Sequence, residues 1–449
     1  MTKALLIGKD GRTDCIAEAL QVGGAELHIL SEIRNPGFLQ RAKSFELART
    51  DDVRAVVAYA RQVRPDVVVV GPEEPLAAGV VDAIQQELGT PCFGPTKRLA
   101  RLESSKSFTR DLLAKYSIPG RVEYRVFETP LGLEDYALSL GEFVVKPDGL
   151  TGGKGVRVFG DHFVTPDEGI SYALELLREG GGPVVIEERL DGEEFSLQSF
   201  CDGERMVDMP PVQDHKRALE DDQGPNTGGM GTYSCADHLL PFLSQAEVRE
   251  AQQINARVAR ALMTETGEPY RGVLYGGFMV TANGVKLIEY NARFGDPEAM
   301  NVIPLIKGNF LDVCMQVATG TLRAGSVSFR PLASVCKYVV PQGYPTHRVR
   351  GVPLEIPAPS DDWRMYYAAV QLEADRVMLT GSRALCFVAT GSTVEEASLK
   401  AERGAAAVGG PVYHRRDIGT SALLAKRVEH MNKIRSRQRV ASGVVDAFH

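Results

Sequence analysis

Short apolar runs alternate with amphipathic stretches over the first hundred residues. Runs such as "KALLIG" and "DVVVVG" are typical of buried strands, and stretches with helical spacing lie between them, for example near residues 52–63 and 76–88. This alternation predicts an open parallel, Rossmann-like sheet with helices on both faces. Ligands bind to such sheets at the carboxyl ends of the strands, so the loops "GKDGRTD" and "GPEEPL" are the first places to expect a site.

The rest of the chain predicts units of mixed α+β type. A helix in "SKSFTRDLLAKY" leads to the strand "EFVVKP", a glycine loop, a helix near 167–178 and the strand "PVVIEERL". An antiparallel region with a long helix near 244–265 follows, and beyond about 331 short strands accompany one helix. We predict an N-terminal α/β domain at 1–103, a middle domain at 104–330 with a small lid subdomain at about 123–187, a small C-terminal α+β domain at 331–429, and a helical end with a loose tail at 430–449.

Composition and charge narrow the class of protein. The 51 basic and 58 acidic residues give the 449-residue chain a net charge of −7, which argues against a polyanion-binding surface. The seven cysteines are odd in number and lack metal-ligand spacing, so we expect reduced, packed thiols. The N-terminus has no export signal, and no apolar run reaches the roughly 20 residues that cross a bilayer. The sequence predicts a cytoplasmic monomer or homodimer that acts on small molecules, without nucleic-acid or membrane partners.

A glycine-rich loop follows the strand that ends near Lys146. In "VVKPDGLTGGKGVRV" the loop contains Gly149, Gly152, Gly153 and Lys154 before the chain returns as a strand. Glycines let backbone N–H groups approach phosphate oxygens, and the lysines supply compensating charge. The spacing is neither a P-loop nor a dinucleotide fingerprint. Taken alone, a flexible hairpin with surface lysines explains the stretch as well as a phosphate flap does.

An acidic crossover, "VVIEERLDGEEFSL", comes next. Glu187 ends a buried strand, Leu190 follows it, and Glu194 lies beyond a short turn. A strand that crosses between two units can present backbone groups to an adenine edge, while a carboxylate beyond it accepts hydrogen bonds from ribose hydroxyls. A solvated turn is sufficient to explain Glu188 and Glu193.

The strand in "KLIEYNARFGDPE" carries paired oxygen donors. Residues two apart in a strand share a face, so Glu289 and Asn291 point the same way. Mg²⁺ bound by phosphates takes such sparse oxygen ligation. A solvent-facing strand is the alternative, but Arg293, Asp296 and Glu298 follow directly around a turn, which favours a site.

The charged stretch "QDHKRALEDDQGPNTGGMG" at 213–231 has the period of neither a helix nor a strand. It predicts a loop in which Lys216 and Arg217 neutralise a phosphate or carboxylate, and in which the Gly-Gly turn lets the backbone approach a ligand. His215 has the chemistry of a base. A histidine between charged neighbours is more often a hydrogen-bond donor, so we favour binding over proton transfer.

The glycine flap, the acidic crossover and the paired-donor strand, in this order, resemble the ATP-grasp fold, in which two α+β units hold ATP and magnesium between them. Within it, "GPTKRLARLESSKSFTRDLL", "GPNTGGMG", "NARFGDPE" and "YHRRDIG" closely resemble the phosphoribosylamine–glycine ligase family of purine synthesis. The resemblance covers roughly residues 4–425.

The resemblance implies that ATP phosphorylates the carboxylate of glycine and that the amine of 5-phosphoribosylamine then displaces phosphate, giving glycinamide ribonucleotide and ADP. It assigns a metal ion, Mg²⁺ or Mn²⁺, to Glu289 and Asn291, and catalytic charges to Lys146, Lys216 and Arg293. The implied nucleotide contacts are Lys106, Lys146, Gly152, Gly153, Lys154, Glu187, Leu190 and Glu194. The implied substrate contacts are Gly11, Arg12, Gly71, Pro72, Glu73, Asp214, His215, Lys216, Asn226, Thr227, Gly228, Arg293, Gly295, Asp296 and Glu298.

The first loop departs from the pattern of that family. The family usually has Gly-x-Gly-Gly-Arg-Glu-His, whereas Asp10, Thr13 and Asp14 replace Gly, Glu and His in "GKDGRTD"; "NPGF" replaces the usual Pro-Gly-Asn. These changes concern the amine substrate and leave the ATP chemistry untouched. Two further hypotheses remain open: a carboxylate–amine ligase with another amine, and a nucleotide-binding regulator without turnover. The regulator is disfavoured because the metal-side residues and the lysines are all present.

Overall fold

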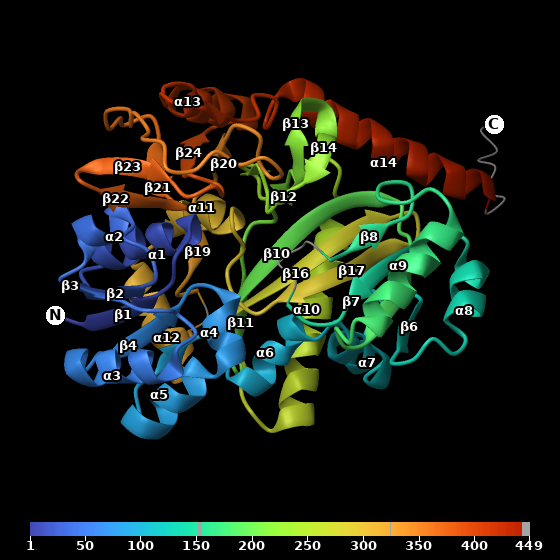
Figure 1. Cartoon of the computed structure of the whole chain (residues 1–449), viewed down its shortest axis with the longest axis horizontal. Helices are drawn as coiled ribbons and strands as arrows, with labels where there is room; N and C mark the ends of the chain where they lie inside the picture. Colours follow the sequence, from blue (N-terminus) through green and yellow to red (C-terminus); the bar gives the residue numbers. More distant parts are fainter. Residues whose placement is uncertain (151–154, 324, 442–449) are drawn as a thin grey trace.

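The N-terminal part is a five-stranded parallel sheet, which confirms the predicted open α/β unit (Figure 1). The computed structural model describes residues 1–150, 155–323 and 325–441. The strand order is β3-β2-β1-β4-β5. The strands are β1 Lys3–Ile7, β2 Glu26–Ser31, β3 Ser44–Leu47, β4 Val67–Val70 and β5 Cys92–Phe93; the helices are α1 Gly11–Val22, α2 Pro36–Arg41, α3 Val53–Val63, α4 Glu73–Ala78 and α5 Val80–Leu88.

Helices cover both faces of this sheet because its strands are apolar on both sides. Leu5 of β1 shares a core with residues of α3 and α5, whereas Leu6 shares the opposite core with residues of α1. The helix predicted near 76–88 is in fact two helices, because Gly79 adopts a positive φ of 94° between them.

A small antiparallel sheet forms the unit that the sequence predicts as a lid subdomain. Its strand order is β6-β9-β7-β8, and its apolar core includes residues of two helices, α8 and α9. The strands are β6 Tyr124–Phe127, β7 Phe143–Pro147, β8 Arg157–Val158 and β9 Val184–Glu188; the helices are α8 Leu133–Leu140 and α9 Pro166–Arg178. Helices α6, Lys97–Ser104, and α7, Lys106–Lys115, lead from the N-terminal sheet into this unit.

The central sheet is antiparallel, as predicted, with the order β11-β10-β16-β17. Its strands are β10 Gly192–Asp202, β11 Met206–Asp208, β16 Arg271–Thr281 and β17 Gly284–Asn291. The long helix α10, Gln245–Thr266, packs against it. The helix begins with a capping box formed by Ser244 and Glu247, which explains the sharp start of the predicted long helix.

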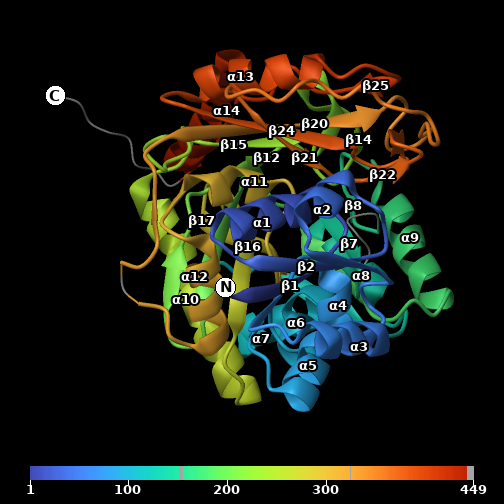
Figure 2. The same cartoon turned by 90° about the vertical axis from the view of Figure 1, so that its left-hand side faces the viewer.

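The third sheet contains strands from two distant parts of the chain. Its order is β12-β15-β20-β24-β21, with β25 paired to β20. The strands are β12 Gln213–Asp214, β15 Gly231–Ser234, β20 Ala333–Pro341, β21 Arg364–Tyr367, β24 Leu385–Gly391 and β25 Val412–Tyr413; α13 is Val394–Ala406. Because β12 and β15 flank the charged loop, that loop is anchored in the C-terminal sheet. Figure 2 shows this sheet as a layer above the N-terminal domain.

The remaining elements are short, apart from the last helix. Three two-stranded ribbons are β13 Arg217–Leu219 with β14 Gln223–Asn226, β18 Ile306–Lys307 with β19 Ser328–Phe329, and β22 Val370–Glu373 with β23 Arg376–Leu379. The remaining helical segments are η1 Glu220–Asp222, α11 Glu298–Val302, η2 Ile303–Leu305, α12 Phe310–Thr319 and α14 Ser421–Ala441. Helix α14 is longer than the helical end expected from the sequence. No helix within the described ranges is long and apolar enough to cross a membrane. The seven cysteines are free and buried.

Candidate active site

Glu187 holds two cations at the junction of the lid and the central sheet. The guanidinium of Arg110 donates to both carboxylate oxygens of Glu187, at 2.6 and 2.9 Å, and Lys146 Nζ lies 2.6 Å from Oε2. All three side chains are under 10% exposed. Burial raises the pKa of Glu187, but Arg110 and Lys146 outweigh that effect and lower the pKa to about 2. Glu187 is therefore ionised and fixes the position of the Lys146 ammonium group.

Arg110 also belongs to this cluster, and the sequence reasoning missed it. It lies on α7 one turn after Lys106, so the two cations share a helix face. Its guanidinium also donates to the carbonyl oxygens of Leu287 and Ile288 in β17, at 3.0 and 2.7 Å. The four-residue spacing between Lys106 and Arg110, which places both on one helix face, is the sequence signal that could have identified Arg110.

A bulge in β17 turns two polar side chains away from the core. Ile288 is an extra residue in this strand, because the register against β16 shifts at that point. Leu287 is buried before the bulge and Tyr290 after it, so Glu289 and Asn291 share the opposite face. Within the described part of the chain, the side chains of Glu289 and Asn291 make no hydrogen bond or ion pair. The predicted pair of oxygen donors is thus available to a ligand.

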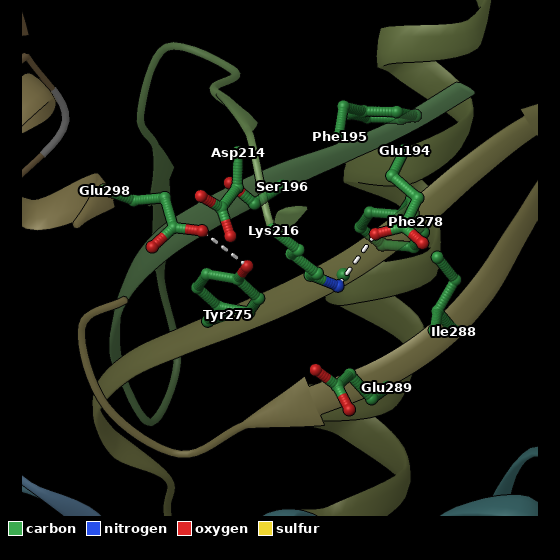
Figure 3. Close-up of a pocket in the computed structure, with 11 residues that line it drawn as sticks. Glu194, Phe195, Ser196, Asp214, Lys216, Tyr275, Phe278, Ile288, Glu289 and Glu298 are labelled. Carbon is green, nitrogen blue, oxygen red and sulfur yellow. Dashed lines mark hydrogen bonds and ion pairs between the residues drawn. The ribbon is translucent and has the colours of Figure 1, made fainter. Parts of the chain in front are cut away.

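Four carboxylates and one ammonium group line the cavity beside this strand, counted over the described residues (Figure 3). Lys216 Nζ donates to Glu194 Oε2 at 2.8 Å, and Glu289 lies across from it. Asp214 and Glu298 form the other side of the cavity. The surplus of negative charge is suited to a cation, either a metal ion or the ammonium group of a substrate.

Asp214 and Glu298, at the far end of this cavity, repel each other electrostatically. Burial raises the pKa of Asp214 well above its usual value, and the neighbouring charge of Glu298 raises it further. Tyr275 donates its hydroxyl hydrogen to Glu298 Oε1 at 2.8 Å. The pKa of Lys216 is raised, chiefly by Glu194, so this lysine stays protonated. A cation between Asp214 and Glu298 would relieve their repulsion.

Lys106 lies at the start of α7, beside the glycine loop. Its Nζ donates to the carbonyl oxygen of Gly149 at 2.8 Å. Asp148 binds the first turn of α7, accepting from the backbone and hydroxyl of Ser107 among others. Burial lowers the pKa of Lys106, and Glu289 opposes that effect. The loop is tied to the helix at this end, while the predicted contacts Gly152, Gly153 and Lys154 lie outside the described residues.

Leu190 follows the crossover strand, as predicted. Neither its N–H nor its carbonyl makes a hydrogen bond to another described residue. Free backbone groups beside a buried strand end are what an adenine edge requires.

The charged loop is ordered by its own short contacts. The backbone N–H of Thr227 donates to the carbonyl of Lys216 at 2.7 Å, and its hydroxyl does so at 2.8 Å. Asn226 ends β14 and is exposed. His215 is 1% exposed, and its Nδ1 lies 3.0 Å from the carbonyl oxygen of Gly231. Burial, with Arg427 and Arg415, lowers the pKa of His215 to about 3. The imidazole is therefore neutral at physiological pH, in agreement with a binding role.

A second cluster joins the first loop to the segment after β17. Arg12 is 4% exposed; it pairs with Asp10, donates to the carbonyl oxygen of Phe294 at 2.6 Å and lies 3.7 Å from Glu73. Arg293 binds Glu73 at 3.0 Å and Glu103 at 2.8 Å.

These partners place Arg293 in the second cluster, and Tyr275 and Glu298, which line the first cavity, also act electrostatically on its guanidinium. Its predicted part in phosphoryl transfer stays a prediction. Other predicted contacts frame the same cluster. Gly11 is the first residue of α1, Pro72 caps α4, and a Cβ on Gly71 would lie 2.7 Å from the Thr13 hydroxyl. Gly295 donates its N–H to Gln198 Oε1 at 2.8 Å.

A cavity of about 250 Å³ opens between this cluster and the C-terminal sheet. Lys9, Asp10, Asp296, Tyr338 and Arg383 are among its lining residues. Tyr338 donates to Asp296 Oδ1 at 2.7 Å, and Arg383 Nη2 lies 3.1 Å from the same oxygen.

Arg383 connects this cavity to the charged loop. Its Nη1 donates to the carbonyl oxygens of Gly228 at 2.7 Å and of Asp296 at 3.0 Å, and its guanidinium lies over the Tyr338 ring at 4.4 Å. The sequence reasoning missed Arg383, because nothing in "TGSRAL" marks it. The predicted contacts Gly228 and Asp296 thus meet at one guanidinium.

Models of three domains of one family match the chain in sequence order. The phosphoribosylglycinamide synthetase N domain matches residues 2–103, its ATP-grasp (A) domain residues 104–299, and its C domain residues 334–421. The chain belongs to the phosphoribosylglycinamide synthetase family. The ATP-grasp fold expected from the three sequence elements is therefore confirmed.

Relatives in this family match over nearly the whole chain. Phosphoribosylamine–glycine ligase of Methanothermobacter thermautotrophicus is 47% identical over 441 residues, which cover 97% of this chain and 100% of the relative. The protein of that name from Methanocaldococcus jannaschii is 44% identical, covering 96% and 100%. The crystal structure of phosphoribosylamine–glycine ligase from Thermotoga maritima has a TM-score of 0.78 at 28% identity, covering 93% of this chain and 100% of that chain.

More distant structures share the fold alone. The biotin carboxylase domain of Hydrogenobacter thermophilus 2-oxoglutarate carboxylase, solved with the magnesium salt of ADP, has a TM-score of 0.72 at 12% identity. The match covers 96% of this chain and 94% of that chain.

Three residues differ from the usual first loop of the family, and their side chains face different surroundings. Thr13 is fully buried, and Asp14 is buried against Arg41, at 2.6 Å, and the N–H of Tyr367, at 2.9 Å. Asp10 caps α1 through Thr13, pairs with Arg12 and lines the second cavity. Of the three changes, Asp10 is the one that borders the cavity.

Proposed function

We propose that the protein is an ATP-dependent carboxylate–amine ligase that joins glycine to 5-phosphoribosylamine, giving glycinamide ribonucleotide, ADP and phosphate. The observation that carries the proposal is the position of Glu289 among three lysines. Its charge favours the protonated form of Lys106, Lys146 and Lys216, and so opposes the effect of burial on the pKa of the first two. Three ammonium groups around a free carboxylate are suited to a polyphosphate with its metal ion.

The chemistry requires two anions to meet. The carboxylate of glycine attacks the γ-phosphorus of ATP, the bond to the β–γ bridging oxygen breaks, and ADP leaves. Lys106, Lys146 and Lys216 lower the electrostatic cost of this approach when protonated, a form that the charge of Glu289 favours in each of them. No nucleophilic side chain is needed. The ammonium group of glycine fits between Asp214 and Glu298, whose mutual repulsion it would relieve.

The donor set is suited to Mg²⁺ or Mn²⁺. Over the described residues, no three His, Cys, Asp or Glu side chains are grouped to hold a metal ion by themselves. Glu289 and Asn291 would hold the ion together with phosphate oxygens and water, which is the sparse ligation that Mg²⁺ takes with nucleotides. When bound, the ion neutralises phosphate charge and orients the γ-phosphate.

The second step joins the amine to the activated carboxyl group. The amine of 5-phosphoribosylamine attacks the carbonyl carbon of glycyl phosphate, a C–N bond forms, the C–O bond to phosphate breaks, and the proton lost by the amine passes to the departing phosphate or to water. We assign the phosphorylated sugar to the cavity of about 250 Å³, where Lys9 and Arg383 supply positive charge. Gly228 links this cavity to the charged loop through Arg383. The loop thereby lies between the two cavities.

Steady-state formation of ADP tests the proposal. Purified protein is mixed with ATP, Mg²⁺, glycine and 5-phosphoribosylamine generated from ribose 5-phosphate and ammonia, and ADP is followed by a coupled assay. We expect ADP formation that requires both glycine and the ribosyl amine. Formation with glycine and a different amine would reject phosphoribosylamine as the substrate, and ATP binding without turnover for any pair would reject the ligase assignment.

Lys146→Met serves as the site variant in the same assay. We expect a rise of roughly 100-fold or more in the ATP concentration for half-maximal rate, since a buried charge facing phosphate is lost. Lys115→Met is the matched control, because Lys115 is exposed and pairs with Glu265 at the surface. Equal behaviour of the two variants would contradict the assignment of Lys146.

A further inference from the structure

Helix α14 extends beyond the part of the chain that the family's C-domain model matches, which ends at residue 421. The helix leaves the C-terminal sheet and runs across to the lid side of the molecule (Figure 1). It contacts β10 and β16 of the central sheet, and Met431 and Ile434 are buried in the same core as those strands. The helix therefore packs against the unit that carries the nucleotide side of the site.

Two residues of α14 hold Glu193 at the start of β10. His430 Nδ1 lies 2.7 Å from Glu193 Oε1, and Arg427 Nε lies 3.6 Å from Oε2. Gln213 Nε2 also donates to Oε2, at 3.2 Å. Glu193 is 5% exposed, so the expectation that it lies on a solvated turn is wrong. His430 and Gln213 form hydrogen bonds with its carboxylate, and Arg427 adds a longer ion pair in which Nε makes no hydrogen bond.

The same arginine holds the charged loop. Arg427 Nη2 lies 2.5 Å from Asp222 Oδ2, and Arg415 Nη1 lies 3.0 Å from Asp222 Oδ1. The ribbon of β13 and β14 begins directly after Lys216. Asp222 is the last residue of η1, the turn between these two strands. Arg427 thus joins β10 to the loop, two segments that are distant in sequence.

Along the chain, each of these two contacts is close to one member of the Glu194–Lys216 pair. Glu193 is the neighbour of Glu194, and neighbouring residues of a strand point to opposite faces, so fixing Glu193 on one face orients Glu194 on the other. Holding Asp222 restrains the loop that carries Lys216. We propose that Arg427 is a positioning residue for the nucleotide site, which it serves by fixing both halves of the Glu194–Lys216 pair. The inference depends on the proposed function, because it concerns the same ATP site.

If its role were purely structural, Arg427 would be one of several residues that attach α14 to the rest of the protein. Arg435 provides the comparison. It lies two turns further along α14, where Nη2 binds Glu247 at 2.8 and 3.0 Å and the carbonyl oxygen of Phe242 at 3.0 Å. This contact fastens α14 to α10 and lies apart from the residues that line the cavity.

The experiment compares Arg427→Gln with Arg435→Gln in the full chain. Arg427→Gln loses the ion pairs with Glu193 and Asp222, and Arg435→Gln loses the one with Glu247, so both are expected to lower the Tm. We expect the KM for ATP to rise roughly tenfold in Arg427→Gln, with kcat and the KM for glycine changed much less, because a misplaced binding group costs affinity. In Arg435→Gln the KM for ATP should equal that of the parent protein. Equal KM values for ATP in the two variants would overturn the inference.

Glu193→Gln keeps the test decisive if Arg427→Gln does not fold. This variant removes the charge at the other end of the same contact, and we expect a similar rise in the KM for ATP. Where both fold, the rise in the double variant should be smaller than the two single effects combined, since both changes remove the contact between Arg427 and Glu193; fully additive effects would count against the proposal. A parent protein without saturable ATP-dependent turnover would reject the proposed function itself. Normal turnover in all variants would reject this inference alone.

Discussion

Replacing Glu187 by glutamine removes the negative charge that Arg110 and Lys146 share. The carboxyl pKa falls from its usual 4.5 to about 2 in the folded protein, which corresponds to about 3 kcal/mol of stability. Removing one partner of a buried ion pair typically costs about 3–5 kcal/mol, because the remaining charge is left buried. We therefore expect the free energy of unfolding of Glu187→Gln to fall by about 3–5 kcal/mol at pH 7.

Urea unfolding measures this loss, with Glu188→Gln as the matched control. Glu188 is the next residue, is partly exposed and accepts one backbone hydrogen bond, from Glu123 at 2.9 Å, so its replacement should cost less than about 1 kcal/mol. The lowered pKa also fixes the pH dependence. The stabilising contribution of Glu187 is complete above about pH 4.5 and is lost as pH falls toward 2. The free energies of unfolding of the parent protein and of Glu187→Gln should therefore converge over that range. Equal stability of the two variants at pH 7 would refute the account of the buried cluster.

Three further outcomes follow from the site. Glu289→Gln should raise the Mg²⁺ concentration for half-maximal ADP formation by roughly tenfold or more, since a charged oxygen donor is lost; an unchanged Mg²⁺ dependence would reject the metal assignment. Arg383→Lys should raise the KM for the ribosyl amine more than the KM for ATP, because a lysine cannot bind Gly228 and Asp296 together; equal rises would count against the second cavity as the amine site. His215→Gln should leave the acid limb of the pH–rate profile in place, because a histidine with a pKa of about 3 does not titrate between pH 5 and 9; loss of that limb would restore His215 as a base.

The sequence predicted the elements of the site better than their connections. The period of two in β17 correctly placed Glu289 and Asn291 on one face, because that relation is local. The bulge at Ile288, which turns this face away from the core, depends on pairing with β16 and has no signal in "KLIEYN". Local patterns therefore identified the candidate donors, while the sheet determined the direction in which they point.

Contacts between distant segments were beyond a reading of local patterns. The sequence pattern predicts that Glu193 lies on a solvated turn, but a helix more than 200 residues later covers it. The acids of the charged loop are another case, because Asp222 binds Arg415 and Arg427 rather than facing the cavity. The altered first loop is the third, since Asp14 is buried against Arg41. In each case the partner is set by tertiary packing, which periodicity does not encode.

Transfer of oxygen from glycine to phosphate tests the central claim most directly. Glycine labelled with ¹⁸O in both carboxyl positions is turned over with ATP and 5-phosphoribosylamine, and the inorganic phosphate is analysed by mass spectrometry. Activation through glycyl phosphate predicts one ¹⁸O atom in each phosphate released, since the C–O bond breaks on the carbon side. Phosphate that forms together with glycinamide ribonucleotide but carries no label would contradict the account.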